Sequence, residues 1–399
     1  MFKINALIST VAGILLLAGC CNCVYTVDIT NPIDSDRHPE MVEIDMQKIP
    51  LDEGETFVVK NSKGCEVPYQ VTSDNKLIFQ VNMTADGKET FQICKGEPSE
   101  YESLVFGKYY ADKDDDFAWE NDKAGYRMYG HKLDVASGYD IFCKRGTHLP
   151  VLETLYANEV YSSDAWKRYH ELEAVSEEEA FRFKMDTLSF HVDRGYGMDV
   201  YAVGPTLGAG IAALMRDDVI AYPRCYDSYE ILDMGPLRFS VRFTFRPLSD
   251  EICKDAIETR TITLDAGSHL NRTSVSFSGL DSEMEIAAGI VLREDGGVAV
   301  AEAEKGYISY PAPTQNHDTR KEVDNGTIYI GHVYPSTVKE AKIAQGHVMT
   351  VSSYIPDNEF VYYWGSGWNH ADILSAEQWN QYLETFSKMV RNPLHITIR

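Results

Sequence analysis

The chain has 399 residues, 44% hydrophobic and 25% charged, which is ordinary for a globular protein that buries a core. This length predicts two domains, or one large β domain with an appendage. The 37 basic and 61 acidic residues leave a net charge of −24, which argues against general nucleic-acid binding because neutralising phosphates needs exposed Lys and Arg. The 24 Tyr, 16 Phe and 5 Trp, together with many short apolar runs, favour β structure.

The N-terminus has the pattern of a bacterial lipoprotein signal peptide. An apolar segment, Ala6 to Leu17, follows Lys3 and is too short to span a bilayer as a mature helix. Leu17-Ala18-Gly19-Cys20 then resembles a lipobox, in which Cys20 is acylated and residues 1–19 are removed. The alternative is a plain secretory signal. We expect an outer-membrane protein held by its lipid anchor alone, and no acidic run follows Cys20, which favours the periplasmic face.

Seven cysteines follow Cys20, and no two of these seven are spaced as Cys-x-x-Cys, so zinc binding has little support. In an exported protein Cys65 and Cys94 could form a disulfide, because both lie in one predicted small domain. Buried free thiols are the alternative.

Residues 20–98 read as a small β-sandwich domain, which we expect to resemble an immunoglobulin fold. Short strands are predicted at 56–59, 67–70 and 77–81, with a turn at 73–76. A polar stretch near 96–101 predicts the boundary to a larger domain, residues 99–399.

In the larger domain, residues 237–246 alternate strictly between apolar and polar side chains, which predicts a strand. Residues 260–264 and 271–277 predict its neighbours, and 394–398 a last strand that could close the sheet. Ser375 and Ser176 are predicted helix N-caps, each followed three residues later by Gln or Glu. The predicted fold class is mainly β, with sheets packed on sheets and few short helices.

Three stretches carry a family resemblance. They are Asp115-Asp116-Phe117-Ala118-Trp119-Glu120-Asn121-Asp122 with Tyr126 to Gly130, then Phe190-His191-Val192-Asp193-Arg194-Gly195-Tyr196-Gly197-Met198-Asp199 with Val203 to Gly210, and Tyr362 to Trp368. Nearly all of the mature chain resembles a bacterial family of unknown function, DUF4861. The family pattern has a histidine where this sequence has Arg194. The resemblance implies an exported protein of a glycan-utilisation locus, often for uronate polymers, with a large antiparallel β-supersandwich like that of galactose mutarotases. It supplies no catalytic assignment.

The second motif holds the candidate catalytic residues His191, Asp193 and Tyr196. On an extended segment the first two project to one face, where the Asp could fix the tautomer of the His and raise its basicity. Tyr196 could transfer a proton. The alternative is a structural loop with a hydrogen-bonded histidine.

The first motif places acidic side chains around Trp119. Carboxylates such as Glu120, Asp122 and, from the second motif, Asp199 could hydrogen-bond sugar hydroxyls while the indole stacks on a sugar ring. Dense oxygen ligands also allow calcium, although the EF-hand spacing is missing. No other cofactor is predicted, and a solvated acidic loop is the alternative.

Cations follow the acidic loop. Arg127, Lys144 and Arg145 could bind a uronate carboxylate, and we favour function for Arg127. For the row Arg238, Arg242 and Arg246 we expect neutralisation by nearby acids. The third motif could line a carbohydrate cleft through Tyr363, Trp364 and Trp368, or it could be a core strand with a bulge.

The leading functional hypothesis is an enzyme that acts on uronate-containing oligosaccharides by β-elimination, with arginine on the carboxylate and His191 or Tyr196 as base. Glycoside hydrolysis by Glu120 and Asp193 is a close variant. A mutarotase or epimerase, and a non-catalytic glycan-binding lipoprotein, are the alternatives. No Gly-x-Ser-x-Gly elbow or phosphate-binding loop is present.

Overall fold

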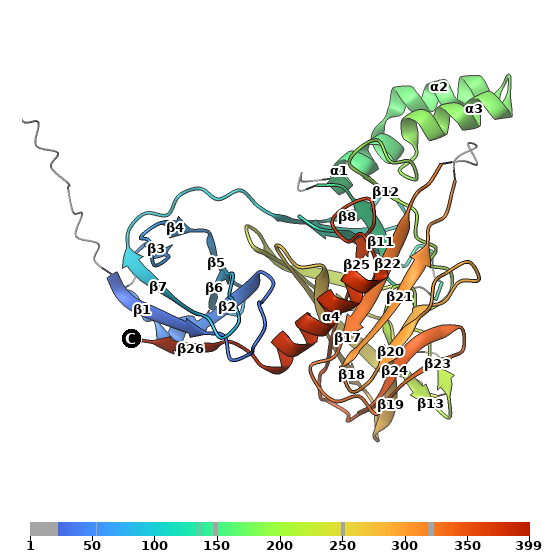
Figure 1. Cartoon of the computed structure of the whole chain (residues 1–399). Helices are drawn as coiled ribbons and strands as arrows, with labels where there is room; N and C mark the ends of the chain where they lie inside the picture. Colours follow the sequence, from blue (N-terminus) through green and yellow to red (C-terminus); the bar gives the residue numbers. More distant parts are fainter. Residues whose placement is uncertain are drawn as a thin grey trace, which may run out of the picture.

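The computed structural model describes residues 23–52, 54–133, 135–136, 138–146, 151–248, 252–317 and 323–399. The predicted signal peptide and the lipidation site Cys20 lie outside these residues. In the described part the chain is mainly β, with antiparallel sheets and four short α-helices, which confirms the predicted fold class (Figure 1). None of the described helices combines the length and apolar character needed to cross a membrane.

Two small sheets form the N-terminal part of the molecule. One has five strands in the order β26-β1-β7-β3-β4, and the other has three in the order β2-β6-β5. Their bounds are β1 Cys23–Thr30, β2 Glu40–Asp45, β3 Phe57–Lys60, β4 Glu66–Val67, β5 Tyr69–Val71, β6 Lys76–Val81, β7 Lys88–Lys95 and β26 His395–Ile398. Inward-facing apolar residues of both sheets, among them Val27, Val59 and Phe79, share one core. The strands predicted at 56–59 and 77–81 are present as β3 and β6, each within one residue of the predicted ends. The strand predicted at 67–70 is divided into β4 and β5, which belong to different sheets.

The predicted C-terminal strand exists but does not close the large sheet. It is β26, and it pairs with β1, where Val27 lies opposite Ile398 and Ile29 lies opposite Ile396. The preceding helix α4 (Ala376–Arg391) packs along the large sheet over a length of about 24 Å, and the strand that follows it pairs with β1. The N-terminal sheet is thus completed by the other end of the chain.

The possible disulfide between Cys65 and Cys94 does not form. Cys94 is bonded to Cys23, because β1 and β7 are neighbours and these two cysteines lie opposite each other in the ladder. Cys65 is an exposed free thiol, and Cys143 is a buried free thiol.

The larger part of the molecule contains three further antiparallel sheets. An eight-stranded sheet has the order β15-β16-β17-β18-β25-β22-β21-β20, and two five-stranded sheets have the orders β12-β11-β10-β9-β8 and β14-β13-β19-β24-β23. The strands of the eight-stranded sheet are β15 Ser228–Met234, β16 Arg238–Thr244, β17 Ile257–Asp265, β18 Leu270–Ser278, β20 Val300–Glu302, β21 Tyr307–Pro313, β22 Thr327–Val333 and β25 Phe360–Trp368. The other strands are β8 Val105–Tyr110, β9 Asp116–Asn121, β10 Gly125–Met128, β11 Asp140–Lys144, β12 Gly197–Asp199, β13 Ala212–Arg216, β14 Val219–Ile220, β19 Met284–Val291, β23 Glu340–Ala344 and β24 His347–Tyr354.

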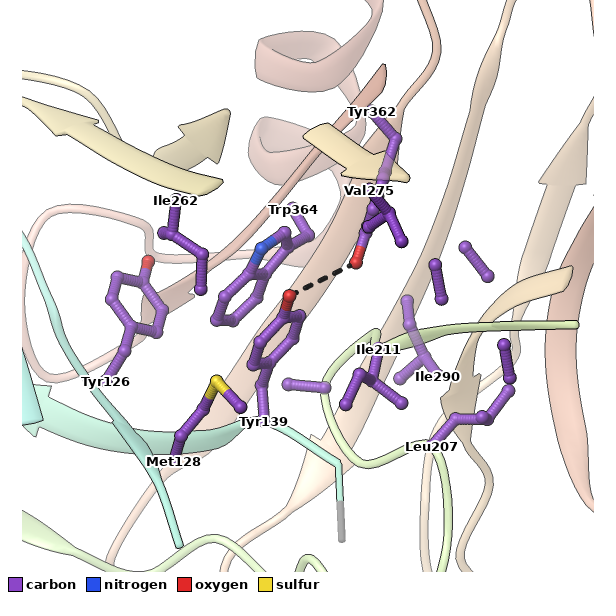
Figure 2. Packing of buried hydrophobic residues seen from close by; sticks show 14 of the residues in the cluster. Tyr126, Met128, Tyr139, Leu207, Ile211, Ile262, Val275, Ile290, Tyr362 and Trp364 are labelled. Atoms are coloured by element: carbon purple, nitrogen blue, oxygen red, sulfur yellow. Dashed lines mark hydrogen bonds between the residues drawn. The ribbon is translucent and has the colours of Figure 1, made fainter. Parts of the chain in front are cut away.

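The eight-stranded sheet has apolar residues on both faces. In β22, Ile328 and Ile330 point into the main core, whereas Tyr329 and Val333 pack with α4 on the opposite face. The main core also contains aromatic rings that lie between the sheets. Figure 2 shows Tyr139 and Trp364 in this core, with their rings stacked 3.8 Å apart between centroids. Burial on two faces fixes the register of the sheet, since a one-residue slip of a strand would move each of its side chains to the opposite face.

The remaining helices lie between β11 and β12. They are α1 Val151–Tyr156, α2 Ser163–Glu173 and α3 Glu177–Phe183, with π-helical turns at Ala157–Tyr161 and Lys184–Leu188. The α2–α3 hairpin projects away from the sheets (Figure 1). Both predicted N-caps are confirmed: Ser176 accepts from the Glu179 amide, and Ser375 accepts from the Gln378 amide.

Candidate functional site

The second motif forms a turn-rich loop at the end of the five-stranded sheet that contains β11. The amide of Asp199 donates to the carbonyl of Phe190 at 2.8 Å and closes the loop. Gly197 has a φ of 138°, and a Cβ at this position would lie 2.2 Å from the carbonyl oxygen of Cys143, so only glycine fits. Arg194, which replaces the histidine of the family pattern, donates to the carbonyls of Ser189 and Met185 and braces the same loop.

Arg127 lies beside this loop in a buried cluster of acids. Its guanidinium pairs with Asp199 at 2.8 Å, with Asp116 at 3.4 Å and with Asp140. The Tyr129 hydroxyl accepts from Arg127 at 3.0 Å and donates to Asp140 at 2.9 Å. All four charged residues are at most 4% exposed. The prediction that Arg127 binds a substrate carboxylate is therefore not supported, because its donors already serve the protein's own acids.

One arginine cannot balance three carboxylates, so this cluster favours bound protons. Burial, followed by the charge of Asp140, raises the pKa of Asp199 well above its ordinary value. Burial also raises the pKa of Asp116 to about 6. Although burial opposes its charge, Arg127 has a pKa raised above its ordinary value by Asp140, Tyr129, Asp199 and Asp116. At neutral pH we therefore expect Asp199 to be protonated and Arg127 charged.

His191 has the features of a neutral base. Its Nδ1 lies 2.6 Å from the backbone carbonyl of Asp199, which can only accept, so this nitrogen carries the proton. No hydrogen-bond partner of Nε2 exists among the described residues, and the ring stacks on His317 at 4.2 Å. Burial, as the largest cause, lowers the pKa of His191 to about 4. Burial also lowers the pKa of His317.

Two adjoining cavities share His191 as a wall. The first has a volume of about 310 Å³ and the second about 280 Å³. Side chains that line the first include Arg127, Tyr129, His191, Asp199, Tyr201, Arg293 and His317. The second is lined by Arg145, His191, Val192, Asp193, Met198, Val323, Asp324, Asn325 and His370. The structure thus brings Arg127, Arg145, His191, Asp193 and Asp199 of the predicted set together.

Asp193 does not orient His191 as the sequence predicts. Its carboxylate pairs with Arg145 and accepts from the amides of Gly195 and Gly197. This difference arises because the segment forms turns instead of an extended strand, although both residues line the second cavity. Tyr196 accepts a hydrogen bond from Asn158 at 3.0 Å and does not line either cavity.

Residues of the first motif are mostly structural. Trp119 is fully buried and donates to Asn271, so it cannot stack on a sugar in this structure. Glu120 is also fully buried and pairs with Lys144 at 2.9 Å, which neutralises both predicted site residues. Asp122 accepts from the Gly267 amide at 2.6 Å. These residues lie on strand β9 or directly after it, and none of them lines either cavity.

The third motif is a strand with one member near the site. Trp364 is fully buried in the main core, and Tyr363 packs against Phe386 of α4 on the other face of the sheet. Trp368 is also buried, but the guanidinium of Arg145 lies 4.7 Å from the centroid of its ring. Trp368 therefore contacts a residue that lines the second cavity without lining the cavity itself. The core-strand alternative therefore describes this motif best.

Two further predictions concern metal binding and the basic row Arg238, Arg242 and Arg246. Within the described residues, no group of three or more His, Cys, Asp or Glu side chains could hold a metal ion. The expected neutralisation of the basic row is confirmed, since Arg238 pairs with Asp265, Arg242 with Glu230 and Arg246 with Asp227.

Several residues of the first cavity carry no sequence signal. Tyr129 lies in the first motif, but Tyr201, Arg293 and His317 lie in stretches without spacing or periodicity that indicates a site. They meet because β10 pairs with β11, and because the loop before β22 reaches the second motif.

Comparison with protein families settles the relationship of the chain. The model of the family "Domain of unknown function (DUF4861)" matches residues 29–396. The chain belongs to this family. Its relative "Uncharacterized protein P7" from Formosa agariphila is 24% identical over 405 residues, which cover 94% of this chain and 93% of that protein.

Solved structures are only distantly similar. An alpha-mannosidase and a protein in glycosyl hydrolase family 38, both from Enterococcus faecalis, give TM-scores of 0.49 and 0.46 at 8% identity. The match covers 94% of this chain in both cases but 46% and 47% of those chains, so this chain spans less than half of their length. At these scores we draw no conclusion about the fold or activity from either protein.

Proposed function

We propose that this protein cleaves uronate-containing oligosaccharides by β-elimination, with His191 as the general base. One observation carries the proposal: Nδ1 of His191 is held by the Asp199 carbonyl at 2.6 Å, which leaves Nε2 as a lone-pair base on the wall of two cavities. A sugar unit in each cavity would place the linkage between them beside this nitrogen.

The proposed step needs one base and one acid. His191 Nε2 takes the proton on the carbon next to the uronate carboxyl group, and that electron pair forms a carbon–carbon double bond. The bond to the leaving glycosidic oxygen breaks, and this oxygen takes a proton from Asp199, with no water consumed. Opposite pKa shifts support these roles, because burial lowers the pKa of His191 to about 4 and raises that of Asp199.

The hydrolytic variant has weaker support. It needs two carboxyl groups, Glu120 and Asp193, but each pairs with a cation of the protein, Lys144 and Arg145. Glu120 is also closed off from both cavities. An epimerase on a free sugar would use the same histidine and acid, so product analysis must separate it from a lyase.

We also propose that the protein works outside the cytoplasm, anchored in the outer membrane through a lipid on Cys20. The disulfide between Cys23 and Cys94 supports an oxidising compartment. The family resemblance to proteins of glycan-utilisation loci supports a carbohydrate substrate.

The test incubates the purified protein with a panel of saturated and unsaturated uronate oligosaccharides in water enriched in ¹⁸O. Elimination predicts new ultraviolet absorbance and products without the label, whereas hydrolysis predicts labelled products. Replacement of His191 by Gln should lower turnover by roughly 10²- to 10⁴-fold. The matched control is His395→Gln, an exposed histidine on β26. Full turnover by the His191 variant, or recovery of unchanged ligand from the native protein, would reject the proposal.

A further inference from the structure

The wall of the first cavity contains two hydrogen-bond donors that the proposed reaction does not use. Arg293 follows β19, and Tyr201 follows β12, and both line this cavity together with His191. The Arg293 guanidinium donates to the carbonyls of Ala202 and Val203, which directly follow Tyr201 in the chain. The two donors therefore belong to adjoining parts of one cavity wall.

Arg293 is held in place without being neutralised. Its backbone amide donates to the Tyr310 hydroxyl at 2.8 Å, and that hydroxyl donates to the Arg293 carbonyl at 3.0 Å. One guanidinium nitrogen donates to the carbonyls of Ala202 and Val203. Among the described residues no carboxylate pairs with Arg293, and its Nε is buried without a partner. Arg127, in contrast, is surrounded by three carboxylates.

Tyr201 is the second donor. The residue is 5% exposed, and its hydroxyl is buried with no hydrogen-bond partner in the described part of the chain. A buried hydroxyl without a partner destabilises the folded state unless a ligand or water satisfies it. Because Tyr201 lines the cavity, a ligand there is the natural partner.

We propose that Arg293 and Tyr201 bind the carboxylate of the substrate and so determine the specificity for acidic sugars. This inference rests on the proposed function and identifies the residues that recognise its substrate. A carboxylate accepts well from a guanidinium and a hydroxyl. The other titratable groups of the cavity do not compete. Arg127 is already engaged by its three carboxylates, and lowered pKa values keep His191 and His317 neutral.

Isothermal titration calorimetry tests this inference with a glucuronate or galacturonate trisaccharide and its carboxyl-reduced, neutral counterpart. The native protein should prefer the acidic ligand. Arg293→Gln should weaken acidic binding by roughly tenfold to a hundredfold and leave neutral binding unchanged. Tyr201→Phe should weaken acidic binding by a smaller factor. The control Arg242→Gln removes an exposed arginine that pairs with Glu230 and should change neither ligand.

The outcomes separate this inference from the proposed reaction. His191→Gln should lose turnover but keep the preference for the acidic ligand. If the native protein prefers the acidic ligand but does not turn it over, the result rejects the lyase and supports the role of Arg293. Equal binding of both ligands, no binding of either ligand, or an unchanged preference in Arg293→Gln would overturn the inference. If Arg293→Gln does not fold, as judged by circular dichroism, Arg293→Lys and Tyr201→Phe provide the same comparison.

Discussion

Arg127 and Arg293 border the same cavity, yet their surroundings give them different roles. Arg127 compensates three buried acids, so Arg127→Met should lower the free energy of unfolding by about 3–5 kcal/mol, because it leaves Asp116, Asp140 and Asp199 unpaired. Denaturant unfolding measures this change. The exposed Arg242 is the control, and its replacement by Met should cost less than about 1 kcal/mol. Equal effects of the two substitutions would contradict the structural role of Arg127.

The lowered pKa of His191 predicts the acid limb of the pH profile. A base acts when it is unprotonated, so kcat/KM should hold as pH falls past 6.5 and decline tenfold per pH unit below about 4. The unfolded state takes up this proton at higher pH than the folded state, so His191 also destabilises the fold as pH falls from about 6.5 to about 4. Circular dichroism at each pH separates unfolding from lost activity. An acid limb near 6.5 would contradict the assignment.

At the scale of elements, caps set where helices begin. Ser375 accepts from the Gln378 amide at 3.2 Å, and α4 then places Trp379 and Leu383 on the large sheet. Ser375→Ala should lower the free energy of unfolding by about 1 kcal/mol, whereas Ser375→Asn should nearly preserve it. Denaturant titration of both variants compares them directly. A loss of similar size in both would show that the cap bond is not the cause.

Strand pairing is the other feature at this scale, and it decides which layer of the fold covers each aromatic side chain of the third motif. Alternation along β22 and β25 sends neighbouring side chains to opposite faces, so Trp364 is in the main core while Tyr363 meets α4. The sequence indicated the strand but not which layer would cover each face. Trp364 and Trp368 are buried as a result, which favours the core-strand alternative for them.

At the scale of the whole molecule, the first and last described strands, β1 and β26, pair in the N-terminal sheet, and the disulfide between Cys23 and Cys94 fixes β1 there. It closes a loop with a sequence separation of 71, so Cys23→Ser should lower the free energy of unfolding by about 2–4 kcal/mol. Cys65→Ser, at an exposed free thiol, should have little effect. Denaturant unfolding of both variants under oxidising conditions tests this, and a large loss in Cys65→Ser would contradict the pairing.

The sequence by itself determined the features that depend on near neighbours. The mainly β class, the strand around 238–244 and the caps Ser176 and Ser375 follow from periodicity and local hydrogen bonding. The motifs also indicated His191 and Asp199, which line the cavity. Only the tertiary structure decided which charges are neutralised, which aromatics are covered, and that Tyr201 and Arg293 border the cavity beside His191. Burial and ion pairing join residues from distant strands, and no local pattern encodes those distances.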